Sequence, residues 1–181
     1  MPFADSLRRY RVGATIVDRH DADDIRSQLR PLLLRGQTKF HWGDEKPERR
    51  IQFLRVIAPL AATTIVVTHV DKISVKEERS RRKCLEHLYP LLTEALVSDL
   101  TLESRTPTQN KNDVAHIVAW QGMGRNLGIR LDHCPGKDDP LLWIPDAILG
   151  AVNAHALGDA SYLTELDARN IKHVITRESL I

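Results

Sequence analysis

Short runs of β-branched residues alternate with longer segments of helical periodicity along almost the whole chain. The run at residues 63–70, TTIVVTHV, is nearly all apolar, which is typical of a strand buried on both faces in the middle of a sheet. Segments with apolar residues three and four positions apart, such as residues 22–34, indicate helices that cover such a sheet. This alternation predicts an α/β fold in which helices connect strands of a mixed sheet.

The predicted order of elements places antiparallel strands at the start of the chain. Residues 1–8 are few enough to form one strand, which a hairpin joins to a second strand at residues 11–18. Later strands are predicted at residues 63–70, 98–104, 127–133 and 171–176. Helices are predicted at residues 22–34, 47–60, 75–96, 113–121 and 141–156.

Length and charge set the outer bounds. A chain of 181 residues is the size of one ordinary domain, so we expect a single domain over residues 1–181. A net charge of +2 at pH 7 is too small to indicate a nucleic-acid partner by itself.

Cysteine usage and hydropathy bear on the compartment. Cys84 and Cys134 have no C-x-x-C spacing, which favours two reduced thiols over a zinc ribbon. No apolar run approaches the roughly 20 residues of a membrane span, and the start MPFADSLRRY lacks the apolar core of a signal peptide. We therefore expect a cytoplasmic protein without membrane contact.

Residues 39–45, KFHWGDE, concentrate polar chemistry between two predicted helices. This loop either caps the helix that follows or belongs to an active site assembled from distant parts of the chain. Asp44 and Glu45 precede Pro47, which fits the first turn of a helix. We interpret both carboxylates as groups favoured by the positive end of that helix, and not as metal ligands.

Asp146 is the only ionisable side chain between Leu141 and Ala154, in the strongly apolar segment LLWIPDAILGAV. A carboxylate on a buried helix costs several kcal/mol, on the order of a full desolvation penalty, unless a metal, a cation or a hydrogen-bond donor compensates it. The alternative is that the helix begins at Asp146, directly after Pro145, and that the carboxylate is its N-cap.

Two further carboxylates lie on predicted strands. Glu103 ends the strand at residues 98–104, and the carboxyl ends of strands in α/β sheets often carry functional groups. An exposed carboxylate paired with Arg105 is the structural alternative. Asp5 is a lone acid on the first predicted strand, where a turn-forming Asp-Ser is the alternative.

These segments resemble the bacterial domain-of-unknown-function family 3800, whose members are ribonuclease-H-like in fold. FADSLR matches the early strand that carries an Asp, with Asp5, although the usual Asp-Glu-Ser is shortened here to Asp-Ser. KFHWGDE matches the His-containing segment with His41, and TLESR matches the acidic strand with Glu103. WIPDAILGAV matches the late Asp-bearing helix with Asp146, and LLLRGQTKFHW, RRKCLEHL and PLLWIPDAILGAV are most similar to an actinobacterial branch.

The resemblance implies a ribonuclease-H-like mixed sheet flanked by helices, with a site made of Asp5, His41, Glu103 and Asp146. Clustered carboxylates repel one another unless a cation holds them, so Asp5, Glu103 and Asp146 would be metal ligands. Hard oxygen ligands suit Mg²⁺ or Mn²⁺. Two such ions about 4 Å apart would activate a water and stabilise the leaving oxygen of a phosphodiester, with His41 contacting phosphate or transferring a proton.

The resemblance leaves two classes of function open. The first is a divalent-metal-dependent nuclease or phosphodiesterase acting on nucleic acid. The second is a non-catalytic module of the same fold, which binds a protein partner or a second copy of itself in a defence or mobile-element system. The fold alone does not decide between them.

Other motifs have structural interpretations. Arg79, Arg82 and Lys83 share a helix face, which is most simply a solvated face, with backbone phosphate contact as the alternative. The glycine-rich QGMGRNLG precedes a strand and lacks the strand-to-helix setting of a dinucleotide loop. His133 and Cys134 have no second pair at zinc spacing.

Overall fold

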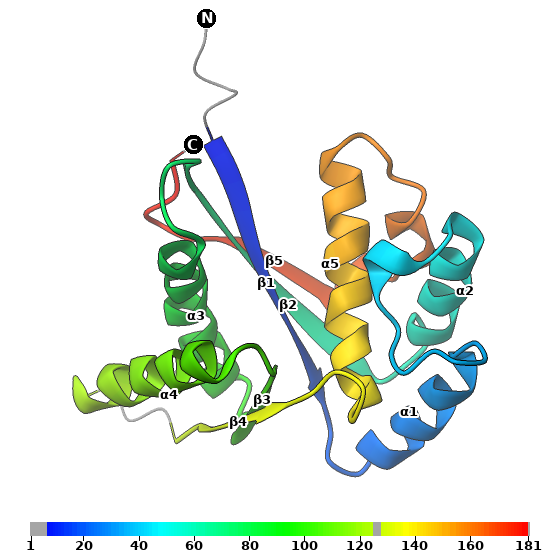
Figure 1. Cartoon of the computed structure of the whole chain (residues 1–181), viewed down its shortest axis with the longest axis horizontal. Helices are drawn as coiled ribbons and strands as arrows, with labels where there is room; N and C mark the ends of the chain where they lie inside the picture. The colour runs from blue at the N-terminus through cyan, green and yellow to red at the C-terminus, as the bar shows by residue number, and fades with distance from the viewer. Residues whose placement is uncertain (1–6, 125–127, 181) are drawn as a thin grey trace, which may run out of the picture. The chain divides into compact units, whose positions relative to one another are not determined.

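The computed structural model describes residues 7–124 and 128–180 (Figure 1). The chain divides into two compact units. The first unit consists of Met1–Val12, Val67–Cys134 and His173–Ile181, and the second of Gly13–Val66 and Pro135–Lys172. Three of the four boundaries between them fall inside strands, β1 (Leu7–Val17), β2 (Ala62–Lys72) and β5 (Ile171–Ile175), and the fourth follows Cys134. The predicted single domain stays a prediction.

The three strands form a mixed sheet of order β1-β2-β5. β2 lies in the middle, as the apolar run at residues 63–70 predicts, and Thr64–Val70 are all buried. A second sheet pairs β3 (Asp99–Glu103) in parallel with β4 (Arg130–Cys134), with Leu100 opposite Leu131 and Glu103 opposite Cys134. Strands and helices alternate along the chain, which confirms the α/β class.

Two details of the predicted sheet are wrong. Residues 7–17 form one continuous strand, so no hairpin turn separates residues 1–8 from 11–18. The segment Arg8–Arg11 contains no Gly, Pro, Asn or Asp, which a tight hairpin turn would require. β3, which carries Glu103, pairs with β4 and is not part of the β1-β2-β5 sheet. Its pattern DLTLE buries only Leu100 and Leu102, as a strand with one solvated face does.

The second unit is built around α5 (Trp143–Ala156), with α1 (Ala22–Leu29) and α2 (Pro47–Ile57). α1 ends earlier than the predicted residue 34, because Pro31 lacks a backbone N–H and the chain continues as a 3₁₀ turn, Arg30–Leu32. The rings of Phe40 and Phe53 stack with centroids 3.9 Å apart. The buried core of this unit comprises Ile25, Leu29, Phe40, Phe53, Leu54, Ile57, Leu60, Val66, Trp143, Ile144, Ala147, Ile148, Ala151, Val152 and Tyr162.

The first unit contains α3 (Glu77–Glu94), α4 (Pro107–Gly122), β3 and β4. α4 begins six residues before the predicted residue 113, since Thr106 and Gln109 form a capping box and Pro107 occupies the first turn. Cys84 is buried and Cys134 is partly buried, and neither forms a disulfide within the part of the chain that the structure describes. Burial raises the pKa of the Cys84 thiol to about 12, which makes it unreactive at neutral pH.

In the part of the chain that the structure describes, no helix is both long and apolar enough to cross a membrane.

Candidate functional site

Asp146 lies in the first turn of α5, but it is not the cap of that helix. α5 begins at Trp143, and a 3₁₀ turn, Pro140–Leu142, precedes it. Asp139 caps that 3₁₀ turn, because its side chain accepts a hydrogen bond of 3.0 Å from the N–H of Leu141, and the residue before α5 is Leu142, which makes no side-chain cap. The N-cap interpretation of Asp146 is therefore wrong, and its carboxylate is directed to other partners.

The partners of Asp146 belong to the loop at residues 39–45. Oδ2 of Asp146 lies 3.1 Å from Nδ1 of His41 and accepts a hydrogen bond of 2.8 Å from the backbone N–H of Trp42. The His41 side chain is 48% exposed and that of Asp146 is 30% exposed. A carboxylate only accepts hydrogen bonds, so it favours the neutral tautomer with a proton on Nδ1. The lone pair is then on Nε2, the ring nitrogen that lies away from Asp146.

The loop is held in place by residues that point inward at alternate positions. Phe40 is buried against Phe53, and the indole of Trp42 packs edge-on against Tyr162, with ring centroids 4.9 Å apart. Arg50 lies over the same indole at 4.9 Å and donates a hydrogen bond of 3.0 Å to the carbonyl of Trp42. His41, between these two anchors, is thereby turned outward.

The absence of a side chain at Gly150 leaves the space that the indole of Trp42 occupies. A Cβ atom at Gly150 would lie 2.2 Å from the indole atoms Cγ and Cδ2, a distance at which something must shift. Glycine inside a helix usually costs about 1 kcal/mol relative to alanine. Here it lets the indole lie directly on the backbone of α5. In the sequence, Gly150 is one of several small residues in an apolar helix. The sequence alone therefore does not indicate that Gly150 contacts Trp42.

Glu45 has a structural role. It is buried, and its carboxylate accepts a hydrogen bond of 2.6 Å from Gln37 and lies 3.4 Å from Nε of Arg49. Arg49 also donates to the carbonyl of Leu32. These contacts tie the end of the loop to the segment before it, which accounts for Glu45 without a metal ion. Asp44 is exposed.

The structure brings together two of the four predicted site residues, His41 and Asp146, both in the second unit. Glu103 is the last residue of β3 and belongs to the first unit. Asp5 lies outside the described residues. Within residues 7–124 and 128–180, no group of three or more His, Cys, Asp or Glu side chains could hold a metal ion.

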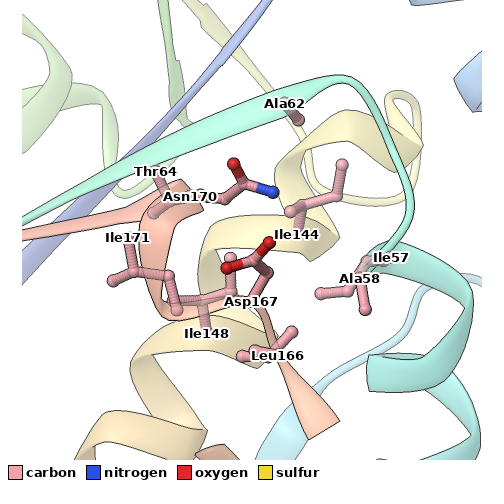
Figure 2. A pocket seen from close by; sticks show the side chains of 10 residues that line it. All are labelled: Ile57, Ala58, Ala62, Thr64, Ile144, Ile148, Leu166, Asp167, Asn170 and Ile171. Atoms are coloured by element: carbon pink, nitrogen blue, oxygen red, sulfur yellow. The ribbon is translucent and has the colours of Figure 1, made fainter.

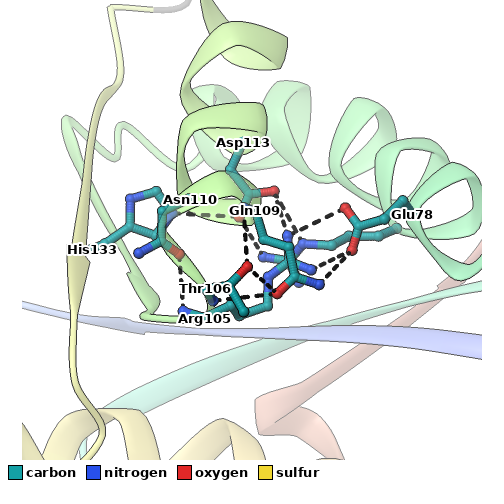
Figure 3. A network of polar contacts seen from close by, with 8 residues as sticks. Glu78, Arg105, Thr106, Gln109, Asn110, Asp113 and His133 are labelled. Carbon is teal, nitrogen blue, oxygen red and sulfur yellow. Dashed lines mark hydrogen bonds and ion pairs between the residues drawn. The ribbon is translucent and has the colours of Figure 1, made fainter.

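A second polar cluster, centred on Asp113 of α4, lies in the first unit (Figure 3). Arg81 binds both oxygens of the buried carboxylate, at 3.1 and 3.0 Å. Arg105 adds a hydrogen bond of 3.1 Å and also pairs with Glu78, and His133 lies 3.4 Å from Oδ2. Arg105 therefore pairs with both Glu78 and Asp113, and His133 belongs to the same polar cluster.

Burial alone would raise the pKa of Asp113. Hydrogen bonding to Arg81 and the charges of Arg81 and Arg105 outweigh it, so the pKa of Asp113 lies below its ordinary value. The carboxylate is saturated by three cation-capable side chains from α3, the segment after β3, and β4. Such a group stabilises the first unit and has no free oxygen for a substrate. Nothing in the sequence marks this cluster, because Asp113 has the pattern of an ordinary polar residue at the start of a helix.

A small cavity lies in the second unit, between α2, α5 and the segment before β5 (Figure 2). Its volume is about 20 Å³, and its lining is mostly apolar, with Thr64, Asp167 and Asn170 as the polar members. A space of this size holds about one water molecule. The cavity is therefore too small for a substrate.

Comparison with known proteins adds no relative: no family model, curated protein or solved structure matches the chain.

The contact between Trp42 and Gly150 gives a first prediction. We expect Gly150→Ala to lower the free energy of unfolding by about 1–3 kcal/mol through overpacking, although alanine favours helix. Urea denaturation measures this change. Gly122→Ala is the matched control, because a Cβ there meets nothing within 4 Å. A stabilising Gly150→Ala substitution would contradict the close approach.

The Asp113 cluster gives a second prediction. Asp113→Asn removes the carboxylate that Arg81 binds through two hydrogen bonds and leaves Arg105 with Glu78 alone, so we expect a loss of stability of about 3 kcal/mol at pH 7. Because the folded pKa of Asp113 is depressed, its contribution is present above the unfolded value of about 3.9 and is lost as the pH falls through the folded pKa. Denaturation curves between pH 7 and acid pH should therefore converge for wild type and variant.

The control for this measurement is Asp132→Asn, which removes a largely exposed carboxylate from β4 of the same unit. An exposed pair contributes about 0–1 kcal/mol, so this variant should stay close to wild type. Equal effects of the two substitutions would show that Asp113 does not organise the cluster.

Proposed function

We propose that this protein hydrolyses phosphodiester bonds, as a nuclease with a ribonuclease-H-like fold, and that His41 and Asp146 form part of its active site. The observation that carries the proposal is the contact of 3.1 Å between Nδ1 of His41 and Oδ2 of Asp146 on a half-exposed imidazole. The α/β class with a mixed sheet is compatible with that fold.

In this proposal His41 is the catalytic residue and Asp146 is a positioning residue. Asp146 holds the proton on Nδ1, so that Nε2 can accept a proton from an attacking water or contact a phosphate oxygen. The two anchors of the loop, Phe40 and Trp42, keep the imidazole turned outward while the carboxylate orients it. The arrangement is that of a general base fixed by a carboxylate on its second nitrogen.

We also propose that the hydrolysis requires Mg²⁺ or Mn²⁺, because the family that the sequence resembles implies a metal-dependent site. Among residues 7–124 and 128–180, both hydrogen bonds that Asp146 accepts go to Oδ2, and the proposal gives Oδ1 to a cation. The described residues alone do not supply a set of three ligands, so Asp5 and Glu103 are proposed as the other ligands on the resemblance only. A bound ion would stabilise charge that develops on the phosphate. The proposed roles of His41 and Asp146 do not depend on it.

A hydrolysis assay tests the proposal. Labelled single-stranded and duplex DNA and RNA are incubated with the protein in Mg²⁺, Mn²⁺ or EDTA. We expect cleavage with a divalent ion, and a fall in rate of about 10²–10⁴-fold in His41→Gln, since a positioned proton-transfer group contributes about that much. His20→Gln, which changes an exposed histidine of the same unit, should cleave like wild type. Absence of cleavage by the wild-type protein under every condition would reject a nuclease.

The metal part is tested by thermal melts with and without Mn²⁺. If Asp146 is a ligand, Mn²⁺ should stabilise the wild type by about 2.7 kcal/mol at one hundred times its dissociation constant, and Asp146→Asn by clearly less. The Asn side chain keeps an acceptor for the N–H of Trp42, so the loop should keep that anchor. An equal Mn²⁺-induced shift in the two proteins would exclude Asp146 as a ligand.

A further inference from the structure

Residues 176–180 follow β5 directly and stay hydrogen-bonded to β2 beyond the end of that strand, and we call them the β5 extension. The N–H of Thr176 donates a hydrogen bond of 2.9 Å to the carbonyl of Thr68. The N–H of Leu180 donates a hydrogen bond of 2.9 Å to the carbonyl of Val70. All four residues belong to the first unit, so these bonds form within one unit.

The side chains of the β5 extension continue these bonds as a hydrogen-bonded chain to β2. The N–H of Val70 donates a bond of 3.0 Å to Oγ of Ser179, which lies 2.8 Å from Oγ1 of Thr176. Oγ1 of Thr176 lies 2.6 Å from Nδ1 of the buried His69, and Nε2 of His69 lies 3.5 Å from Asp71. A hydroxyl accepts as well as donates, so Thr176 and Asp71 could both accept from a protonated His69. Protonation of His69 is therefore compatible with this chain of contacts.

The contact between the β5 extension and α3 is different, because it needs a neutral imidazole. The backbone N–H of Arg177 donates a hydrogen bond of 3.2 Å to Nε2 of His87. Nδ1 of the same ring lies 3.3 Å from the carbonyl of Lys83, which can only accept. The proton of the ring is therefore on Nδ1, and the lone pair that holds Arg177 is on Nε2.

The charges around His87 offer a second proton little compensation. The Glu178 carboxylate lies 3.8 Å from Nε2 of His87 and 3.9 Å from Nζ of Lys83. Lys83 also lies 3.1 Å from Glu86, which His116 approaches at 3.4 Å. The Glu178 side chain is 50% exposed, so water screens its charge, and Lys83 already shares it. Glu178 therefore compensates a positive charge on His87 only in part.

We propose that the β5 extension detaches from α3 when His87 takes up a second proton, which makes its attachment sensitive to pH. The hydrogen on Nε2 would then face the N–H of Arg177, and two donors cannot bond each other. Arg177 lies between Thr176 and Leu180, so its displacement also weakens their bonds to β2. Histidine is the side chain whose charge ordinarily changes between about pH 5 and 8, so the extension is attached at the upper end of this range and released toward the lower end. The proposal goes beyond hydrolysis and does not depend on it.

Amide hydrogen exchange of the full chain, measured by NMR between about pH 8 and pH 5, tests the proposal on the wild-type protein. After correction for the intrinsic effect of pH, we expect the protection of the Thr176, Arg177 and Leu180 amides to fall by about threefold to tenfold on acidification, the effect of one ordinary hydrogen bond. The midpoint of this fall should coincide with the titration of the ring resonances of His87. Protection that stays constant, rises, or follows the titration of His69 would overturn the proposal.

Variants separate His87 from other titrating groups. His87→Gln offers an amide oxygen to the N–H of Arg177 and does not titrate, so protection should be the same at both ends of the pH range. Glu178→Gln removes the partial compensation, so protection should fall further than in the wild type. His20→Gln, which changes an exposed histidine of the second unit, should respond like the wild type. An equal fall in His87→Gln and the wild type would overturn the proposal, and this result would leave the nuclease proposal intact because no cleavage is measured.

Discussion

The direct contact between the indole of Trp42 and the bare backbone at Gly150 is the constraint on which the candidate site depends. A side chain as large as tryptophan can approach a helix this closely only where the helix has no Cβ. With Trp42 seated there, its backbone N–H meets Oδ2 of Asp146, one helical turn before Gly150. The position of His41 follows from that of its neighbour, so a single glycine fixes the geometry of the histidine–carboxylate pair.

The two units treat their carboxylates in different ways. In the first unit, Asp113 is buried and its oxygens are occupied by Arg81, Arg105 and His133. In the second unit, Asp146 is partly exposed, and its two hydrogen bonds with described residues both use Oδ2. Saturated buried ion pairs hold elements together, whereas a carboxylate with one open oxygen beside an exposed imidazole can change partners. This difference is why the proposal gives Asp146, and not Asp113, a role beside the catalytic histidine.

The sequence predicts what depends on local pattern. Alternating β-branched and amphipathic segments identify the α/β class, and the apolar run at residues 63–70 identifies the central strand. An isolated acid in an apolar helix also marks Asp146, and a dense polar loop marks His41. The sequence does not indicate which side chains contact each other when they are far apart along the chain. Asp146 bonds across 104 residues to Trp42. Asp113 meets Arg81 across 32 residues. Neither Asp113 nor Gly150 has an unusual local setting.

The chain crosses from one unit to the other several times, which affects the order in which the units can fold during synthesis on the ribosome. Neither unit is a contiguous segment, because β1, β2 and β5 each belong partly to both. The second unit needs Pro135–Lys172, including α5, before its core residues on α1 and α2 can be covered. The first unit needs His173 and the residues after it. The second unit therefore completes its core only after Pro135–Lys172 has left the exit tunnel, and the first unit only after the segment that begins at His173 has followed. Until then the apolar faces of early helices such as α1 stay exposed. A chaperone that binds apolar segments would bind the nascent chain during this period.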